Sequence, residues 1–191
     1  MSQLEEHYFE NDTQWRKWLH DNHDRSEGIY LIFYKIDHAQ PSMRWEEAVR
    51  VALCYGWIDS TVKSLGNGKR RQYFCRRKPK SVWSKVNKTH LIELEKEGLI
   101  HKSGYHSIAV AKENGSWSDL DDVENGLIPD ELQQAFDTHP KAFANFQMFA
   151  PGYRKSYLYW LHQAKRPETR KKRIEEIIAL CAANIKSRTT R

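Results

Sequence analysis

The stretch that decides the fold is residues 53–88, LCYGWIDSTVKSLGNGKRRQYFCRRKPKSVWSKVNK. Its centre, Gly-Asn-Gly at 66–68, predicts a hairpin turn, because both residue types adopt positive φ at low cost. Strand-forming residues precede the turn at 57–65 and follow it at 71–77. The stretch therefore predicts two antiparallel strands joined by a tight turn.

A helix is expected to follow this hairpin. Pro79 ends the second strand, and Ser84 is placed to cap a helix over residues 85–97, with Asn87 three residues on as a weak capping box. Earlier in the chain, GIYLIFYK at 28–35 predicts a strand. Both of its faces are apolar, so we expect a central, covered strand.

A second helix is expected before the hairpin, over residues 43–55. Ser42 is a natural N-cap for it, and Gly56 follows as a C′ glycine. Apolar residues recur along this segment at helical spacing, which gives it a buried face. These elements together predict an α+β fold, a small antiparallel sheet flanked by helices.

The remainder of the chain is predicted to be helical. The acidic, turn-rich segment 117–125 separates it from the sheet region;. We therefore expect a sheet domain over 1–120 and a C-terminal helical region over 126–191 that packs on it.

The net charge of +6 hides an uneven distribution. Residues 69–80 hold seven basic side chains and no acid, and residues 165–191 hold nine basic side chains and three acids. Such segregation raises the local potential and attracts anionic partners. The alternative is that both basic faces neutralise acidic patches on the same molecule.

The composition narrows the class of protein. No apolar run approaches the roughly 20 residues that span a bilayer, and the acidic N-terminus lacks the order of a secretory signal;. A cytoplasmic location is therefore expected. Cys54, Cys75 and Cys181 are too widely spaced for a disulfide framework or a metal site, which predicts buried thiols;.

Aromatic, acidic and basic residues cluster ahead of the helix at 85–97. A helix N-terminus beside arginines attracts phosphate or carboxylate groups, because its first N–H groups have no partner within the helix. We hypothesise that a small anionic ligand binds a surface formed by Trp57, Asp59, Arg76, Arg77, Trp83, Ser84 and Asn87.

The alternative for the same surface is an enzyme of unknown reaction acting on an anionic substrate. Asp59 would be its general acid or base, in a cleft lined by Trp57 and Trp83. Asp59 is also placed to form a structural ion pair across the hairpin with Arg76 or Arg77. We predict no catalytic serine, metal site or cofactor, because the histidines are scattered and no nucleophile motif is present.

A third reading is binding of a polyanion or of single-stranded nucleic acid. Basic residues interleaved with aromatic ones favour it, because phosphate contacts and base stacking are the usual chemistry of such sites. The residues expected to contact a polyanion are Lys69, Arg70, Arg71, Lys78 and Lys80. No sequence signature of a known nucleic-acid-binding domain accompanies them.

Several motifs, in this order, resemble the YdeI family, which is linked by name to bacteriocin protection and to the porin OmpD. The motifs are WRKWL at 15–19, ALCYGWIDS at 52–60, RRKPKSVWSKVNK at 76–88, AKENGSW at 111–117 and PGYRKSYLYWLHQAKRPETRKKRIEEI at 151–177. The resemblance implies a bacterial protein with an antiparallel sheet flanked by helices. It also implies a role in stress or in tolerance of antimicrobial peptides, which the binding hypothesis would serve.

Overall fold

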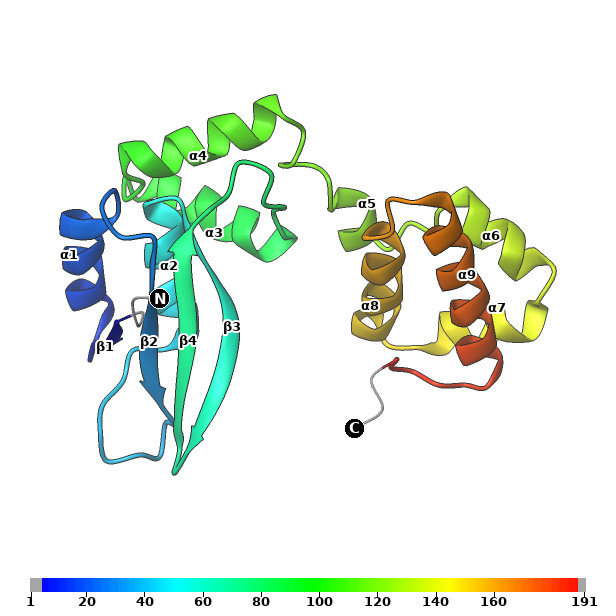
Figure 1. Cartoon of the computed structure of the whole chain (residues 1–191), viewed down its shortest axis with the longest axis horizontal. Coiled ribbons are helices and arrows are strands. Elements are labelled where there is room, and N and C mark those ends of the chain that lie inside the picture. The colour runs from blue at the N-terminus through cyan, green and yellow to red at the C-terminus, as the bar shows by residue number, and fades with distance from the viewer. Residues whose placement is uncertain (1–4, 189–191) are drawn as a thin grey trace. The chain divides into compact units, whose positions relative to one another are not determined.

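The computed structural model describes residues 5–188 and divides into two compact units (Figure 1). Met1–Ser118 forms a sheet unit and Asp119–Arg191 forms a helical unit. The predicted α+β class, with a helical portion after the sheet, is confirmed. None of the described helices is long and apolar enough to cross a membrane.

The sheet unit combines four strands with four helices in its described residues. In chain order they are β1 (Glu6–Tyr8), α1 (Asp12–Asn22), β2 (Gly28–Tyr34), α2 (Trp45–Cys54), β3 (Trp57–Gly66), β4 (Lys69–Arg76), α3 (Lys85–Lys96) and α4 (Lys102–Glu113). The predicted hairpin is β3 and β4, and Gly66, Asn67 and Gly68 all have positive φ in its turn.

The sheet has the order β1-β2-β4-β3. Strand β4 pairs antiparallel with both β2 and β3, whereas β1 pairs parallel with β2. The sheet is therefore mixed and not purely antiparallel. Strand β1 was not predicted, because three residues of a polar lead-in carry no period that could be read.

Aromatic residues dominate the core of the sheet unit. Trp15 and Leu19 of α1 pack with Trp57 and Phe74 of the sheet, and all four are fully buried. Both buried indoles have partners, since Trp15 Nε1 donates to the Ala48 carbonyl and Trp57 Nε1 to the His23 carbonyl. This core holds the C-terminal end of α1 close to the start of β3.

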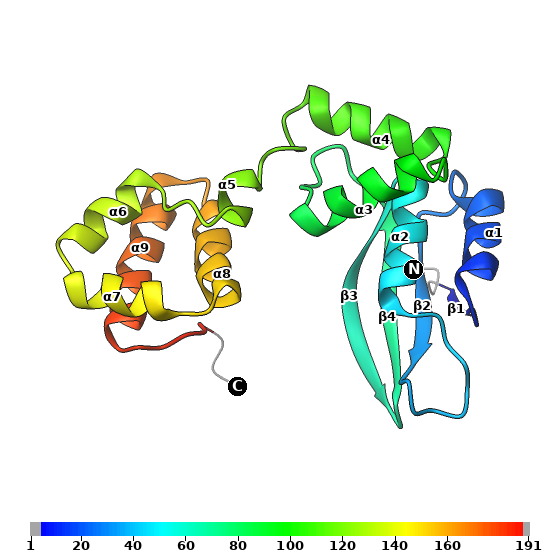
Figure 2. The same ribbon diagram turned by 180° about the vertical axis from the view of Figure 1, so that it is seen from behind.

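Strand β2 is central, as predicted, but helices cover only one of its faces. Ile29, Leu31 and Phe33 point into the core and are buried. Helix α2 lies behind the strands in Figure 1 and in front of them in Figure 2, and none of the helices described for the sheet unit lies on the opposite face. The expectation of a covered strand is therefore wrong for the face that carries Tyr30 and Tyr34.

The N-terminus of α2 differs from the prediction. The helix begins at Trp45, and Arg44 is its N-cap in a capping box with Glu47, whose carboxylate accepts from the Arg44 N–H at 2.7 Å. Ser42 instead accepts from the Tyr34 N–H at 3.1 Å, so it ties the loop to the end of β2. A hydroxyl two residues earlier thus serves the sheet and not the helix.

The helical unit contains five described helices. They are α5 (Asp121–Glu124), α6 (Asp130–Asp137), α7 (Pro140–Met148), α8 (Pro151–His162) and α9 (Pro167–Ala182). Leu132, Phe136, Phe146, Leu161 and Ile177 are among the residues of its separate core. Proline occupies the first turn of α7, α8 and α9, where the missing N–H costs no hydrogen bond;.

Candidate functional site

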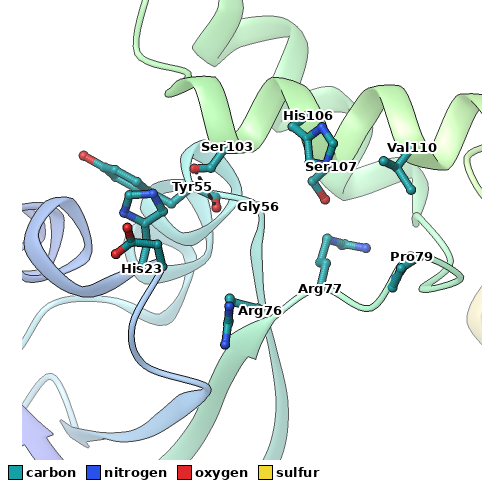
Figure 3. Close-up of a pocket in the computed structure, with 11 residues that line it drawn as sticks. His23, Tyr55, Gly56, Arg76, Arg77, Pro79, Ser103, His106, Ser107 and Val110 are labelled. Carbon is teal, nitrogen blue, oxygen red and sulfur yellow. Dashed lines mark hydrogen bonds between the residues drawn. The ribbon is translucent and has the colours of Figure 1, made fainter.

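A pocket of about 280 Å³ lies at the end of the sheet where β4 finishes (Figure 3). The turn after α1, the α2–β3 turn, the end of β4 and the first turns of α4 form its walls. The residues that line it are His23, Asp24, Tyr55, Gly56, Arg76, Arg77, Pro79, Ser103, His106, Ser107 and Val110.

Arg77 is the most unusual group in this pocket. Its guanidinium lies over the Trp83 ring, 3.6 Å from the ring centroid, and Nη1 donates to the Val82 carbonyl at 3.1 Å. Its Nε and Nη2 atoms are buried and have no hydrogen-bond partner among the described residues. Burial of this guanidinium lowers the pKa of Arg77 to about 10, so it stays charged at neutral pH;.

An unsatisfied buried donor of this kind carries a penalty. Leaving one buried polar group without a partner costs roughly 1–3 kcal/mol, and more when the group is charged. An anion that accepts from Nε and Nη2 would remove the penalty at Arg77 and pair its charge. Native proteins keep few such groups, and those that persist are often found at sites of binding or catalysis.

The turn between α2 and β3 fixes α4 against this arginine. Gly56 has φ +73°, and a Cβ there would lie 2.9 Å from Ser107 Cβ. A Cβ at Gly104 would lie only 2.3 Å from the Cys54 carbonyl oxygen. Two glycines thus allow the backbones to approach, and Figure 3 shows Ser107 of α4 facing Arg77 across the pocket.

A group of aromatic rings lies beside the pocket, and two of them, His23 and Tyr55, are part of its lining. His101 lies 4.8 Å from His23 and 5.0 Å from Tyr55 between ring centroids, with His20 at 6.2 Å. Burial and then His23, Lys102 and His20 lower the pKa of His101, which favours its neutral form. His101 Nδ1 accepts from the Ser103 N–H at 3.3 Å and so caps α4. Within residues 5–188 no cluster of three or more His, Cys, Asp or Glu could hold a metal ion.

The chemistry of this pocket favours an anion. Arg76 and Arg77 bring two positive charges, and Asp24 is the single carboxylate in the lining. Ser103 and Ser107 supply hydroxyl groups from the first turns of α4, where the helix dipole is positive;. Ser103 Oγ already donates to the Tyr55 carbonyl at 3.1 Å, as Figure 3 shows.

The structure brings only part of the hypothesised ligand surface together. Arg76 and Arg77 line the pocket, and Trp83 supports Arg77 from the buried side. Trp57 is 0% exposed and Trp83 1% exposed, so neither indole offers a surface for a ligand. The expectation of two exposed tryptophans in a shared hollow is wrong, because both indoles are large apolar groups that fill the core.

The other three hypothesised residues have local structural roles. Asp59 accepts from Trp45 Nε1 at 2.9 Å and from the Gln72 side-chain amide, and it forms no ion pair with Arg76 or Arg77. It does not line the pocket, so the geometry does not favour the enzyme reading built on it. Ser84 accepts from the Asn87 N–H at 3.3 Å and thereby caps α3.

The residues predicted to contact a polyanion fall at two ends of β4. Lys69, Arg70 and Arg71 lie at the hairpin end, while Lys78 and Lys80 are exposed in the loop after the strand. Residues 72–76 of the strand lie between the two sets and span about 17 Å;. They therefore do not form one continuous basic patch.

The pocket also contains residues outside the hypothesised ligand surface, among them His23, Tyr55, Ser103, His106 and Ser107. They come from three segments that are far apart in the chain. Gly56 and Gly104 are the sequence features that could have indicated this pocket, since each permits a close approach of two backbone segments;. Neither glycine by itself indicates which side chains will meet there.

Two family models match the chain in separate regions. Residues 7–107, more than half of the chain, match a family described as "Domain of unknown function (DUF8412)". The chain belongs to the DUF8412 family. The matched span holds every pocket residue except Val110. Residues 127–184 match the family described as "Bacteriocin-protection, YdeI or OmpD-Associated", which confirms the resemblance to YdeI proteins.

The comparison with curated proteins agrees with this second match. The chain is 29% identical over 90 residues to "Uncharacterized protein YdeI" of Bacillus subtilis (strain 168). The aligned region is 47% of this chain and 46% of that protein, so the chain spans less than half the length of this relative. No solved structure matches the chain.

Proposed function

We propose that this DUF8412 protein binds a small anionic ligand, through a phosphate or carboxylate group, in the pocket beside Arg77. The observation that supports the proposal is the pair of buried, unpartnered donors on Arg77 in a pocket that also holds Arg76. A bidentate anion would accept from two N–H groups of one guanidinium, which is the geometry that arginine provides best.

Binding, and not catalysis, is the activity we propose. The pocket supplies hydroxyl and guanidinium donors and positive charge, from Arg76, Arg77, Ser103 and Ser107. The description of the family that matches the helical unit names bacteriocin protection. We therefore propose that ligand binding in the sheet unit serves a stress response or tolerance of antimicrobial peptides, in the cytoplasm.

The experiment is a calorimetric titration of the full chain at low salt with pyrophosphate, citrate, nucleoside monophosphates and inorganic phosphate. We expect at least one of these anions to bind, and Arg77→Met to lose that binding by about 30-fold or more, because removing one partner of a buried charge pair costs about 2–5 kcal/mol. Arg25→Met, an exposed arginine outside the pocket, is the matched control and should bind as the wild type does.

Two results would contradict the proposal. The first is that none of these anions binds at low salt. The second is that Arg77→Met and Arg25→Met weaken binding equally, because a general effect of net charge would then account for the affinity and the pocket would not.

A further inference from the structure

A second surface lies on the face of the sheet that is not covered by any helix among residues 5–118 (Figures 1 and 2). Alternate residues of β2 and β4 point to this face. In the register, Tyr30 lies opposite Tyr73, Ile32 opposite Arg71, and Tyr34 opposite Lys69. Three tyrosines and two cations therefore share one uncovered face.

The tyrosine rings form a row along the strands. Tyr73 lies across Gly28, since a Cβ at Gly28 would be 2.2 Å from Tyr73 Oη. The Tyr30 and Tyr73 ring centroids are 5.3 Å apart. Tyr34 stacks on His38, with 4.5 Å between ring centroids and 28° between the planes. The three tyrosines are half-buried, so each ring is fixed by its neighbours and still reaches solvent.

Arg71 extends this row of planar groups. Its guanidinium lies over the Tyr30 ring, 4.5 Å from the centroid, and pairs with Glu6 of β1. A guanidinium held flat in this way presents a planar surface on which a nucleobase can stack.

Positive charge borders the row at the hairpin end. Lys69 of β4 lies opposite Tyr34, and Lys63 of β3 lies opposite Arg71, so both lysines point to the face that carries the tyrosines;. Neither lysine forms an ion pair with a described residue. The charge of this end is therefore available to an external anion.

We propose that this uncovered sheet face binds single-stranded nucleic acid, with bases stacked on Tyr73, Tyr30 and Tyr34 and phosphates held by the cations at the hairpin end. Tyr30 and Tyr34 are four residues apart on β2, which is about 13 Å along the strand, and this spacing suits bases that are unstacked from one another;. A duplex keeps its bases stacked inside, so it would meet the cations but not the rings. The free cations favour this occupant over an uncharged sugar polymer.

The experiment measures fluorescence anisotropy of a labelled 12-nucleotide oligo(dT) with the full chain. We expect the single strand to bind more tightly than a duplex of the same length, and affinity to fall with added salt as counterions are released. Tyr73→Ala should weaken binding by about 5- to 100-fold, the effect of losing one stacked base. Tyr73→Phe should retain the affinity, and Tyr105→Ala, an exposed tyrosine on α4, should not change it.

A second measurement needs no variant. Ultraviolet crosslinking of the wild-type chain to an oligonucleotide containing 4-thiothymidine, followed by mass spectrometry, should mark peptides of β2 and β4. Crosslinks found only in the helical unit would overturn the proposal. So would equal affinity for single strand, duplex and heparin with no loss in Tyr73→Ala, because the surface would then be a general polyanion site.

Discussion

Two arginines, one in each unit, lie on tryptophan rings and yet differ in how their donors are used. Arg77 of the sheet unit lies on Trp83 and leaves Nε and Nη2 unpartnered. Arg173 of the helical unit lies over Trp160 and donates to the carbonyl of that same residue. Stacking on an indole is thus common to both, and only the unpartnered donors mark a candidate site.

A second arginine of the helical unit, Arg170, uses more of its donors in contacts within the protein. Arg170 pairs with Glu131 and directs Nη1 at the Leu161 and Ala164 carbonyls at the end of α8. Cations near a helix C-terminus satisfy carbonyls that have no partner within the helix. The comparison teaches that the helical unit uses these arginines for its own stability, whereas Arg77 keeps bonding capacity for something outside the chain.

The largest effect is expected where the indole under the arginine is removed. Trp83→Ala should destabilise the sheet unit by about 3–5 kcal/mol, the usual cost of truncating a buried tryptophan. Trp160→Ala should cost the helical unit less, because Trp160 is only half-buried. Hydrogen exchange followed by mass spectrometry reports each unit separately, and an equal loss in both variants would contradict the difference in burial.

The next effect concerns alkaline pH, to which the helical unit should be sensitive. Burial raises the pKa of Cys181 and that of Tyr157 to about 12 each, from ordinary values of 9.0 and 10.0. Groups whose pKa is raised on folding contribute stability that is complete below the unfolded value and is lost as pH rises through the folded one. We therefore expect the helical unit to lose stability from pH 9 upward.

The control for this pH effect is Cys181→Ala. With the thiol removed, the loss should begin near pH 10, where only Tyr157 titrates. Hydrogen exchange is pH-dependent by itself, so urea denaturation followed by tryptophan fluorescence is the better measurement. Replacing Trp18 and Trp45, two of the six tryptophans of the sheet unit, by phenylalanine lowers the background against which Trp160 is observed. An onset that stays at pH 9 would show that Cys181 is not the group responsible.

The comparison of the two arginines is tested directly by equivalent substitutions. Arg170→Met should destabilise the helical unit by about 1.5–3 kcal/mol, because hydrogen bonds to charged groups are worth that much. Arg77→Met should leave the sheet unit as stable or make it more stable, because a well-packed apolar side chain carries no desolvation penalty. Lys171→Met, exposed on α9, is the control and should change nothing. A sheet unit strongly destabilised by Arg77→Met would assign that arginine a structural role.

The smallest effect is expected at Arg76, the exposed arginine of the pocket. Arg76→Gln should weaken anion binding by about 2- to 5-fold, because an exposed charge pair contributes only about 0.2–1 kcal/mol. The same titration used for Arg77→Met measures it. A loss as large as that of Arg77→Met would mean that burial does not distinguish the two arginines.

Local chemistry allowed much of the fold to be predicted. Gly66, Asn67 and Gly68 specify the turn by their backbone preference, and Ser84 caps α3 through a bond to a residue three positions away. Such features depend on neighbours in the chain, so they can be read from the sequence. Ser42 shows where this reading fails, because its hydroxyl serves β2 and not the adjacent helix.

Only part of the candidate site was predicted, because the rest of it depends on contacts between residues that are distant in the chain. Arg76 and Arg77 stood out as charged residues at a strand end, but Trp57 and Trp83 were placed on the surface with them. The local sequence around a tryptophan on a short strand is the same whether its ring packs in the core or contacts a ligand. Packing against Trp15 and Trp18 decided that Trp57 is buried, and those contacts cross large separations in sequence.

The sequence by itself determined the strands that follow β1, the hairpin and the segregation of positive charge, because each depends on residues a few positions apart. Only the tertiary structure decided that Arg77 keeps two donors without partners, that Ser107 faces it, and that one face of the sheet carries tyrosines without a covering helix. These properties arise from contacts between distant segments, and the burial of a group depends on everything packed around it.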